Sequence, residues 1–168
     1  ACPKKEEFYM SENTNANANT KPNTSSNSPG KRILIVGGVA GGASVAARCR
    51  RLDESSEIIV FERGPHPSYS NCCLPNPLSG EIPHAEDLLL MSPAQFKALH
   101  NIDVRVRQEV TAIDPTTQTI TVRKLEDGTE YQESYDELVL ATGASPILPR
   151  SIEGIGQEHV FSVRDVPD

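Results

Sequence analysis

The fold is decided by residues 33–42, Ile33-Leu34-Ile35-Val36-Gly37-Gly38-Val39-Ala40-Gly41-Gly42. The apolar, largely β-branched run at 33–36 predicts a parallel strand covered on both faces, and glycines follow it at once. Residues 42–52 then read as a helix whose small side chains let its backbone lie close to a sheet. A second apolar run, residues 57–61, ends at Glu62. A strand, glycine turn, helix and strand within about 30 residues predict a βαβ unit.

The glycine turn suits a dinucleotide. The start of a helix offers unpaired N–H groups and a positive dipole end to a diphosphate, and side chains there would push the phosphates away. Glu62, twenty residues after Gly42, stands where a carboxylate accepts hydrogen bonds from ribose hydroxyls. Val39 occupies the middle glycine position of G-x-G-x-x-G, so the fingerprint is broken and a plain tight turn is the alternative. We favour the nucleotide site.

The remaining elements are predicted from shorter patterns. Residues 64–84 are rich in proline and cannot hold a long helix, whereas residues 93–100 predict a short one. Alternating apolar residues between 102 and 122, broken by turn residues, predict a β-meander. Residues 138–141 form another buried-strand run that leads into Thr142-Gly143.

Composition limits the organisation and the function classes. The chain of 168 residues has 16 basic and 23 acidic side chains, a net charge of -7, and a segment at residues 11–30 that is mostly Asn, Ser and Thr. We therefore expect a disordered extension at residues 1–30, with Met10 a candidate start, and one folded unit at residues 31–168. The acidic balance argues against nucleic-acid binding, and no apolar run suits a membrane helix or a signal peptide.

Four cysteines, at positions 2, 49, 72 and 73, form no CxxC pair, and no histidine stands at ligand spacing beside them. This spacing argues against a metal site and against a secreted disulfide framework, and it favours the cytoplasm.

Several motifs together resemble the coenzyme A-disulfide reductase branch of the FAD-dependent pyridine nucleotide-disulfide oxidoreductases, which also contains NADH oxidases, NADH peroxidases and polysulfide reductases. The resembling segments cover nearly all of residues 31–168: residues 31–43, 50–53, 61–64, 70–72, 101–104, 109–114, 135–146 and 161–164. The family itself carries Val at the position of Val39. The resemblance implies an α/β fold, a three-layer Rossmann-like FAD-binding domain with a parallel sheet and an inserted β-meander, incomplete in this chain.

The resemblance also implies the site. It makes Cys72 the single redox-active cysteine, accompanied by Ser68 and Asn71. It assigns FAD binding to Gly37, Gly38, Val39, Ala40, Gly41, Gly42, Glu62, Arg63, Val110, Thr142 and Gly143. It assigns contacts with coenzyme A to Ser44, Arg48 and Arg51. Without the resemblance, two arginines on one helix usually form a solvated face.

Some positions depart from the family pattern. Cys73 stands where the family has Gly or Ala, and it either forms a vicinal disulfide with Cys72 or packs as a small apolar residue; we favour packing. Asn76 and Pro77 replace tyrosines, and Pro77 should cut short the helix that follows the cysteine. His100 stands where coenzyme A reductases can carry a lysine.

The implied activity is NAD(P)H-dependent, FAD-mediated reduction of a small-molecule disulfide, such as coenzyme A disulfide or a related persulfide or polysulfide, at Cys72. Three alternatives stay open. One is NADH oxidase or peroxidase chemistry through a cysteine sulfenate, another is a catalytically incomplete FAD-binding fragment, and the third is a plain NAD-binding module. The family's NAD(P)H-binding and dimerisation domains are not found before Asp168, and the full-length family members suggest a homodimer.

Overall fold

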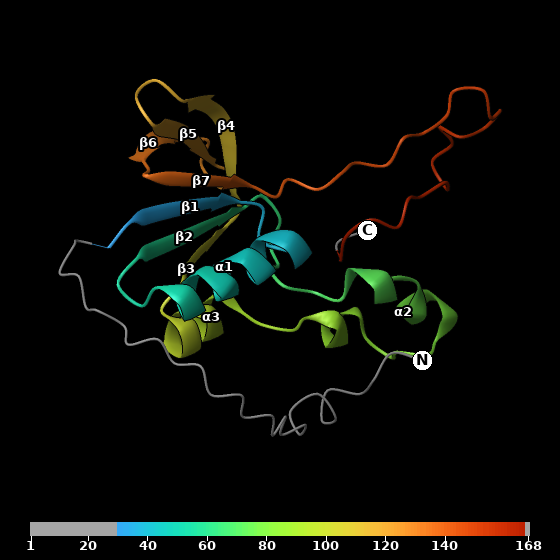
Figure 1. The fold of residues 1–168 in the computed structure, drawn as a ribbon. Helices are drawn as coiled ribbons and strands as arrows, with labels where there is room; N and C mark the ends of the chain where they lie inside the picture. Colours follow the sequence, from blue (N-terminus) through green and yellow to red (C-terminus); the bar gives the residue numbers. More distant parts are fainter. Residues whose placement is uncertain (1–29, 167–168) are drawn as a thin grey trace.

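Two sheets stacked on each other form the centre of the molecule in the computed structural model, which describes residues 30–166 (Figure 1). The first sheet is parallel and has the strand order β3-β2-β1-β7, with β1 at Arg32–Val36, β2 at Glu57–Glu62, β3 at Asp103–Val106 and β7 at Glu137–Leu140. The second is an antiparallel meander of β4 (Gln108–Asp114), β5 (Thr119–Lys124) and β6 (Glu130–Ser134). The predicted α/β class with an inserted meander is confirmed.

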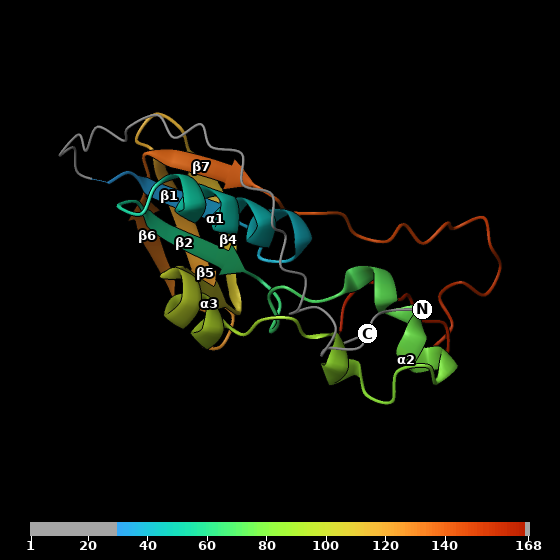
Figure 2. The ribbon, with the colours of Figure 1, turned by 60° about the horizontal axis from the view of Figure 1, so that its bottom comes forward.

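Helices cover the other face of the parallel sheet. These are α1 (Ala40–Leu52) and α3 (Pro93–His100), so the layers run helices, parallel sheet, meander (Figures 1 and 2). The loop between β2 and α3 holds only short turns of helix: η2 (Asn71–Cys73), α2 (Pro75–Ser79) and η3 (Ala85–Leu88). The expectation that the proline-rich segment lacks a long helix is therefore confirmed, and α2 is only five residues long.

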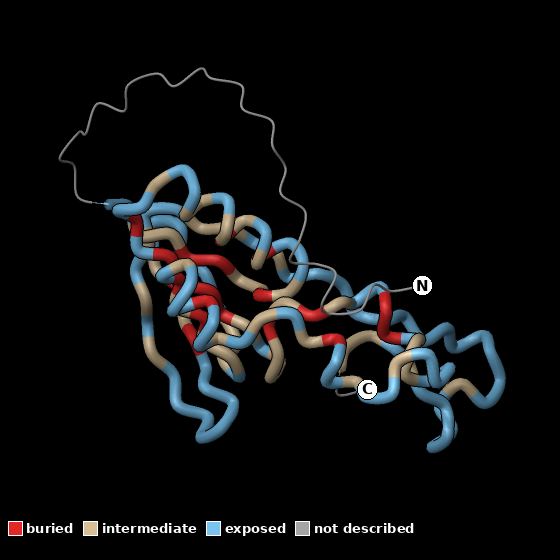
Figure 3. Tube along the Cα trace, turned by 90° about the horizontal axis from the view of Figure 1, so that it is seen from below, coloured by how far each residue is buried: buried red, intermediate tan, exposed pale blue. Residues whose placement is uncertain are grey.

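Alternation along the central strands builds both cores. On β1, Leu34 packs toward the meander and Ile35 toward the helices, and both are fully buried. On β2, Ile59 joins the meander side with Phe61, whereas Ile58 and Val60 join the helix side. Because successive side chains on a strand point to opposite faces, a continuous apolar run is what a strand covered on both faces requires. Figure 3 shows buried positions gathered where these layers meet.

The predicted helix boundaries were close. Helix α3 spans the predicted residues 93–100, because Ser92 forms a capping box with Gln95 and Asn101 ends the helix in the left-handed conformation. Helix α1 begins at Ala40, two residues before the predicted start, so Gly41 and Gly42 belong to its first turn. The predicted βαβ unit is confirmed by the parallel pairing of Ile35 with Val60.

Two strand assignments need correction. Residues 102–106 were expected in the meander, but β3 pairs in parallel with β2, and Arg107 turns the chain with a φ of 54° before β4 begins. Half-buried alternation fits an edge strand of either sheet, so the pattern alone could not assign it. Strand β7 was expected to be buried, yet Leu140 is 59% exposed, because only β1 flanks β7 among residues 30–166.

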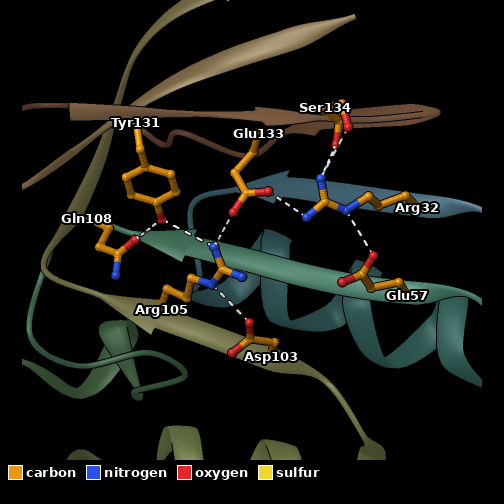
Figure 4. A network of polar contacts seen from close by, with 8 residues as sticks. All are labelled: Arg32, Glu57, Asp103, Arg105, Gln108, Tyr131, Glu133 and Ser134. Atoms are coloured by element: carbon orange, nitrogen blue, oxygen red, sulfur yellow. Dashed lines mark hydrogen bonds and ion pairs between the residues drawn. The ribbon is translucent and has the colours of Figure 1, made fainter.

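A polar cluster joins the two sheets (Figure 4). The Glu133 carboxylate on β6 accepts from Arg32 on β1 and, at 2.6 Å, from Arg105 on β3. Burial alone would raise the pKa of Glu133, but the hydrogen bonds and charges of these two arginines outweigh it and hold that pKa below its ordinary value. The cluster therefore fixes the meander against the parallel sheet at neutral pH.

Beyond β7 the chain runs exposed and then returns to the molecule (Figure 1). The Arg164 Nε donates to the Ala144 carbonyl oxygen at 2.7 Å, and Val166 packs against the buried cluster of Tyr69, Cys73, Leu74 and Leu88. The predicted extension at residues 1–30 lies outside the described residues, apart from Gly30.

The close approach of α1 to β1 generates a stability prediction. A Cβ at Gly42 would lie 1.7 Å from the Gly37 carbonyl oxygen, whereas a Cβ at Gly41 would meet only the Ala141 Cβ at 3.5 Å. We expect Gly42→Ala to lower the free energy of unfolding by about 1–3 kcal/mol through overpacking. The matched Gly41→Ala variant should leave stability unchanged or raise it by up to about 1 kcal/mol, since alanine is the better helix former. Urea unfolding measures both, and equal midpoints for the two variants would contradict the packing account.

Candidate functional site

A cavity of about 610 Å³ opens at the carboxyl ends of the parallel strands. Its walls come from the ends of β1, β2 and β7, the first turn of α1, the start of β4 and residues 162–165. The chain leaves β1 toward β2 on one side, and β7 pairs on the other side, so the cavity lies at the switch point of the sheet. Open α/β sheets bind their ligands at this place.

The start of α1 supplies unpaired backbone donors to this cavity. Val39, Ala40 and Gly41 line it. No side chain caps this helix terminus, and its first turn contains no acidic residue. The first N–H groups of a helix have no partner within the helix, and they carry the positive end of its dipole. This end of the cavity is therefore suited to an anion such as a diphosphate.

Glycines let the backbone form this cradle. Gly37 has a φ of 99°, and a Cβ there would lie 2.2 Å from the Ala141 carbonyl oxygen. Gly42 is buried directly against Gly37, as described above. The turn after β1 thus approaches both β7 and α1 more closely than any side chain would allow.

Glu62 ties the two loops beside the cavity together. Its Oε2 accepts from the Gly38 N–H and its Oε1 accepts from the Gly64 N–H, both at 2.6 Å. A Cβ on Gly38 would approach the Glu62 Cβ to 3.1 Å. An ionised carboxylate has about four acceptor positions, so Glu62 retains capacity for ribose hydroxyl donors while it holds both amides.

The structure gathers most of the predicted cofactor residues around this cavity. Those that line it are Gly37, Val39, Ala40, Gly41, Glu62, Arg63, Val110, Thr142 and Gly143. Gly38 and Gly42 do not line it, and they act on its shape instead: Gly38 binds Glu62 and Gly42 lies beneath Gly37.

Cys72 lies in η2 beside Asn71, and Asn71 lines the cavity. The Cys72 side chain is exposed and free. Its Sγ lies 3.8 Å from the Cys73 Sγ, far beyond the roughly 2.05 Å of a disulfide, so the two cysteines are not joined to each other. Cys73 is buried beside Tyr69, Leu74 and Leu88, but it is disulfide-bonded and therefore does not pack as a free thiol. The vicinal disulfide with Cys72 is excluded, and the favoured packing interpretation needs this correction.

The predicted substrate residues are spread more widely. Ser44, Arg48 and Arg51 are exposed on α1 and do not line the cavity. Ser68 also stays outside it, although its N–H donates to the Gly38 carbonyl oxygen at 3.1 Å and its φ is 50°. Asn71 is the one predicted substrate residue in the cavity wall.

No role in the site was predicted for several lining residues, namely Tyr69, Gln108, Glu109, Ser145, Pro146, Ser162, Arg164 and Asp165. Gln108 and Glu109 directly precede Val110, but the alternation that located this strand carried no signal for its first polar residues. Residues 162–165 reach the cavity only because the chain returns to it after a long exposed excursion.

Two further observations concern residues 30–166 alone. Within that range no three His, Cys, Asp or Glu side chains gather in a way that would hold a metal ion. None of the helices in the described part of the chain has the length and apolar character needed to cross a bilayer.

Comparison with known proteins identifies relatives of this architecture. Coenzyme A disulfide reductase of Staphylococcus epidermidis is 43% identical over 137 residues, which cover 82% of this chain and 30% of that protein. Reduced CoADR-RHD of Bacillus anthracis aligns with a TM-score of 0.78 and 45% identity, over 82% of this chain and 25% of that one. An NAD-dependent persulfide reductase from A. fulgidus aligns with a TM-score of 0.76 and 34% identity, over 81% of this chain and 26% of that one.

The chain thus spans less than a third of the length of these relatives. The model of the pyridine nucleotide-disulphide oxidoreductase family matches residues 31–168, which include both sheets and every predicted site residue. The chain belongs to the pyridine nucleotide-disulphide oxidoreductase family.

Proposed function

We propose that the cavity binds FAD and that the whole protein is an NAD(P)H-dependent oxidoreductase that reduces a small-molecule disulfide through Cys72. The observation that carries this proposal is one cavity in which the uncapped start of α1 faces Glu62, with Cys72 next to the cavity-lining Asn71. The start of α1 and Glu62 fit the diphosphate and ribose of an adenosine diphosphate, and Cys72 adds an accessible thiol.

The residues present fit the dinucleotide part of FAD. The amides at Ala40 and Gly41 suit the diphosphate, because that end of the cavity carries helix-dipole charge and no side chain fills the glycine turn. Glu62 suits the adenosine ribose, as its carboxylate retains acceptor positions. Thr142 and Gly143 line the cavity where the chain leaves β7, on the side that remains for the rest of the cofactor.

Cys72 would react as a thiolate. It attacks one sulfur of the substrate disulfide, a new bond forms between Cys72 Sγ and that sulfur, and the other half of the substrate leaves as a thiolate. Bound FAD would supply the two electrons, derived from NAD(P)H, that cleave this mixed disulfide again. The second half of the substrate then leaves, and Cys72 returns to its thiolate form. The exposed position of Cys72 gives a substrate access to it.

The proposed substrate class is inferred from the relatives of the chain and from the polar residues on the exposed side of α1. Proteins named coenzyme A disulfide reductase and persulfide reductase share this architecture, which supports coenzyme A disulfide or a related persulfide as substrate. Ser44, Arg48 and Arg51 present polar groups on the exposed side of α1, and guanidinium groups suit the phosphates of coenzyme A. The NAD(P)H site and a homodimer interface would belong to the rest of a longer protein.

Replacement of Glu62 tests the cofactor proposal. In Glu62→Gln the side-chain NH₂ must face one of the two backbone N–H groups, so the glycine turn loses a partner and the ribose loses an ionised acceptor. We expect FAD affinity to fall about 10- to 100-fold, as for lost hydrogen bonds to a charged group. Glu126→Gln is the matched control, since it removes an exposed carboxylate that does not line the cavity, and it should bind FAD as the wild type does. Titrating FAD and following flavin fluorescence measures both, and equal affinity of Glu62→Gln and wild type would contradict the assignment.

Replacement of Cys72 tests the chemistry in the whole protein. Cys72→Ser removes the nucleophile, so NAD(P)H consumption with coenzyme A disulfide should fall by at least about 10³-fold while FAD stays bound. Cys49→Ser, at the half-buried free cysteine of α1, should retain the activity. Undiminished turnover by Cys72→Ser would refute the mechanism. Turnover by the wild type on oxygen or peroxide but not on the disulfide would identify oxidase or peroxidase chemistry instead.

A further inference from the structure

A chain of hydrogen bonds runs from the polar cluster between the sheets to the wall of the cavity (Figure 4). Glu133 binds Arg105, the Arg105 Nη1 lies 3.2 Å from the Tyr131 hydroxyl oxygen, and that hydroxyl binds the Oε1 of Gln108. Gln108 lines the cavity, whereas the other three residues do not. The chain of hydrogen bonds thus ends at a residue that lines the cavity.

The donors in this chain allow only one direction. A guanidinium has N–H donors and no acceptor, so the Tyr131 oxygen must accept from Arg105. The single proton of Tyr131 is then available to Gln108, whose carbonyl oxygen accepts it. An amide side chain with its oxygen engaged presents its NH₂ group elsewhere. In Figure 4 the Gln108 nitrogen points away from Tyr131.

Arg105 is held firmly enough to impose this direction. Its Nε donates to the Asp103 Oδ2 at 2.9 Å, its Nη1 donates to Glu133 at 2.6 Å, and its guanidinium lies 5.5 Å from the centre of the Phe61 ring. Glu133 is fixed in turn by Arg32. Side chains with several charge-assisted hydrogen bonds have little freedom to rotate.

The adenine base of FAD would lie at the end of the cavity that Gln108 lines. If the diphosphate lies at the start of α1 and the ribose at Glu62, the base must lie beyond Glu62, because the ribose joins the two. The residues that line the cavity past Glu62 are Arg63 and the first residues of β4, Gln108, Glu109 and Val110. The backbone holds them there, since the Arg107 N–H donates to the Gly64 carbonyl oxygen at 3.2 Å.

We infer that Gln108 donates its side-chain N–H to a ring nitrogen of adenine, and that Tyr131 is a positioning residue that fixes the orientation of the Gln108 amide. The inference rests on the proposed binding of FAD. The ring nitrogens of adenine that are not attached to ribose are acceptors, so an amide nitrogen suits them and an amide oxygen would repel them. The Tyr131 proton favours the orientation in which the Gln108 amide oxygen points toward Tyr131 and its nitrogen points toward adenine.

Binding measurements on four proteins test this inference: the wild-type chain, Gln108→Met, Tyr131→Phe and the double variant. Gln108→Met keeps the side-chain length and removes the donor, so FAD affinity should fall about 5- to 10-fold, as for one neutral hydrogen bond. Tyr131→Phe leaves the amide in place but lets it turn over, so the loss should be about threefold, within the range for such a bond. The double variant should bind no more weakly than Gln108→Met alone, because Tyr131 acts only through Gln108.

FMN, which lacks adenine, serves as the control ligand, and its affinity should be the same in all four proteins. Urea unfolding reports any loss of fold separately. Unchanged FAD affinity of Gln108→Met, additive losses in the double variant, or equal weakening of FAD and FMN would each overturn this inference alone. Failure of the wild-type chain to bind FAD would overturn the proposed function, and this inference with it.

Discussion

The close approach of Gly42 to Gly37 is the constraint on which the rest of the site depends. Because no side chain separates them, α1 begins at Ala40, only four residues after β1 ends, and its first N–H groups lie in the wall of the cavity. Any side chain at Gly42 would push the helix away from the strand. The same turn brings Gly38 beside Glu62, so the anion cradle and the carboxylate that faces it are set by a single piece of backbone.

The rest of the fold supports that turn from two sides. Helices α1 and α3 cover one face of the parallel sheet, and the meander covers the other through Ile120 and Val122. The meander also carries Glu133 and Tyr131, which hold Arg105 and Gln108. It therefore does more than bury the sheet, because its polar residues connect the cluster around Glu133 with Gln108 in the cavity wall. Burial and hydrogen bonding act together there, since a buried carboxylate needs partners to remain ionised.

The sequence predicted those parts of the structure that depend on neighbours along the chain. The βαβ unit, the place of Glu62 and the extent of α3 follow from local apolar runs, glycines and a capping box. The predicted assignment of β3 to the meander was wrong, because the half-buried alternation of this strand would be the same at the edge of either sheet. The exposure of β7 depends on which strands flank it, and Gln108 gains its orientation from Tyr131, 23 residues away. Long-range partners of this kind leave no trace in a local pattern.

The measurement that decides most directly whether a flavin dinucleotide rests on the start of α1 is a titration of the ¹⁵N-labelled chain with FAD, followed through its backbone amide resonances. The amides of Ala40 and Gly41 should show the largest shifts, since these residues line the cavity end suited to the diphosphate. The amide of Gly128, in the tight turn between β5 and β6, should not move. Saturable FAD binding that leaves the resonances of Ala40 and Gly41 unchanged would contradict the account.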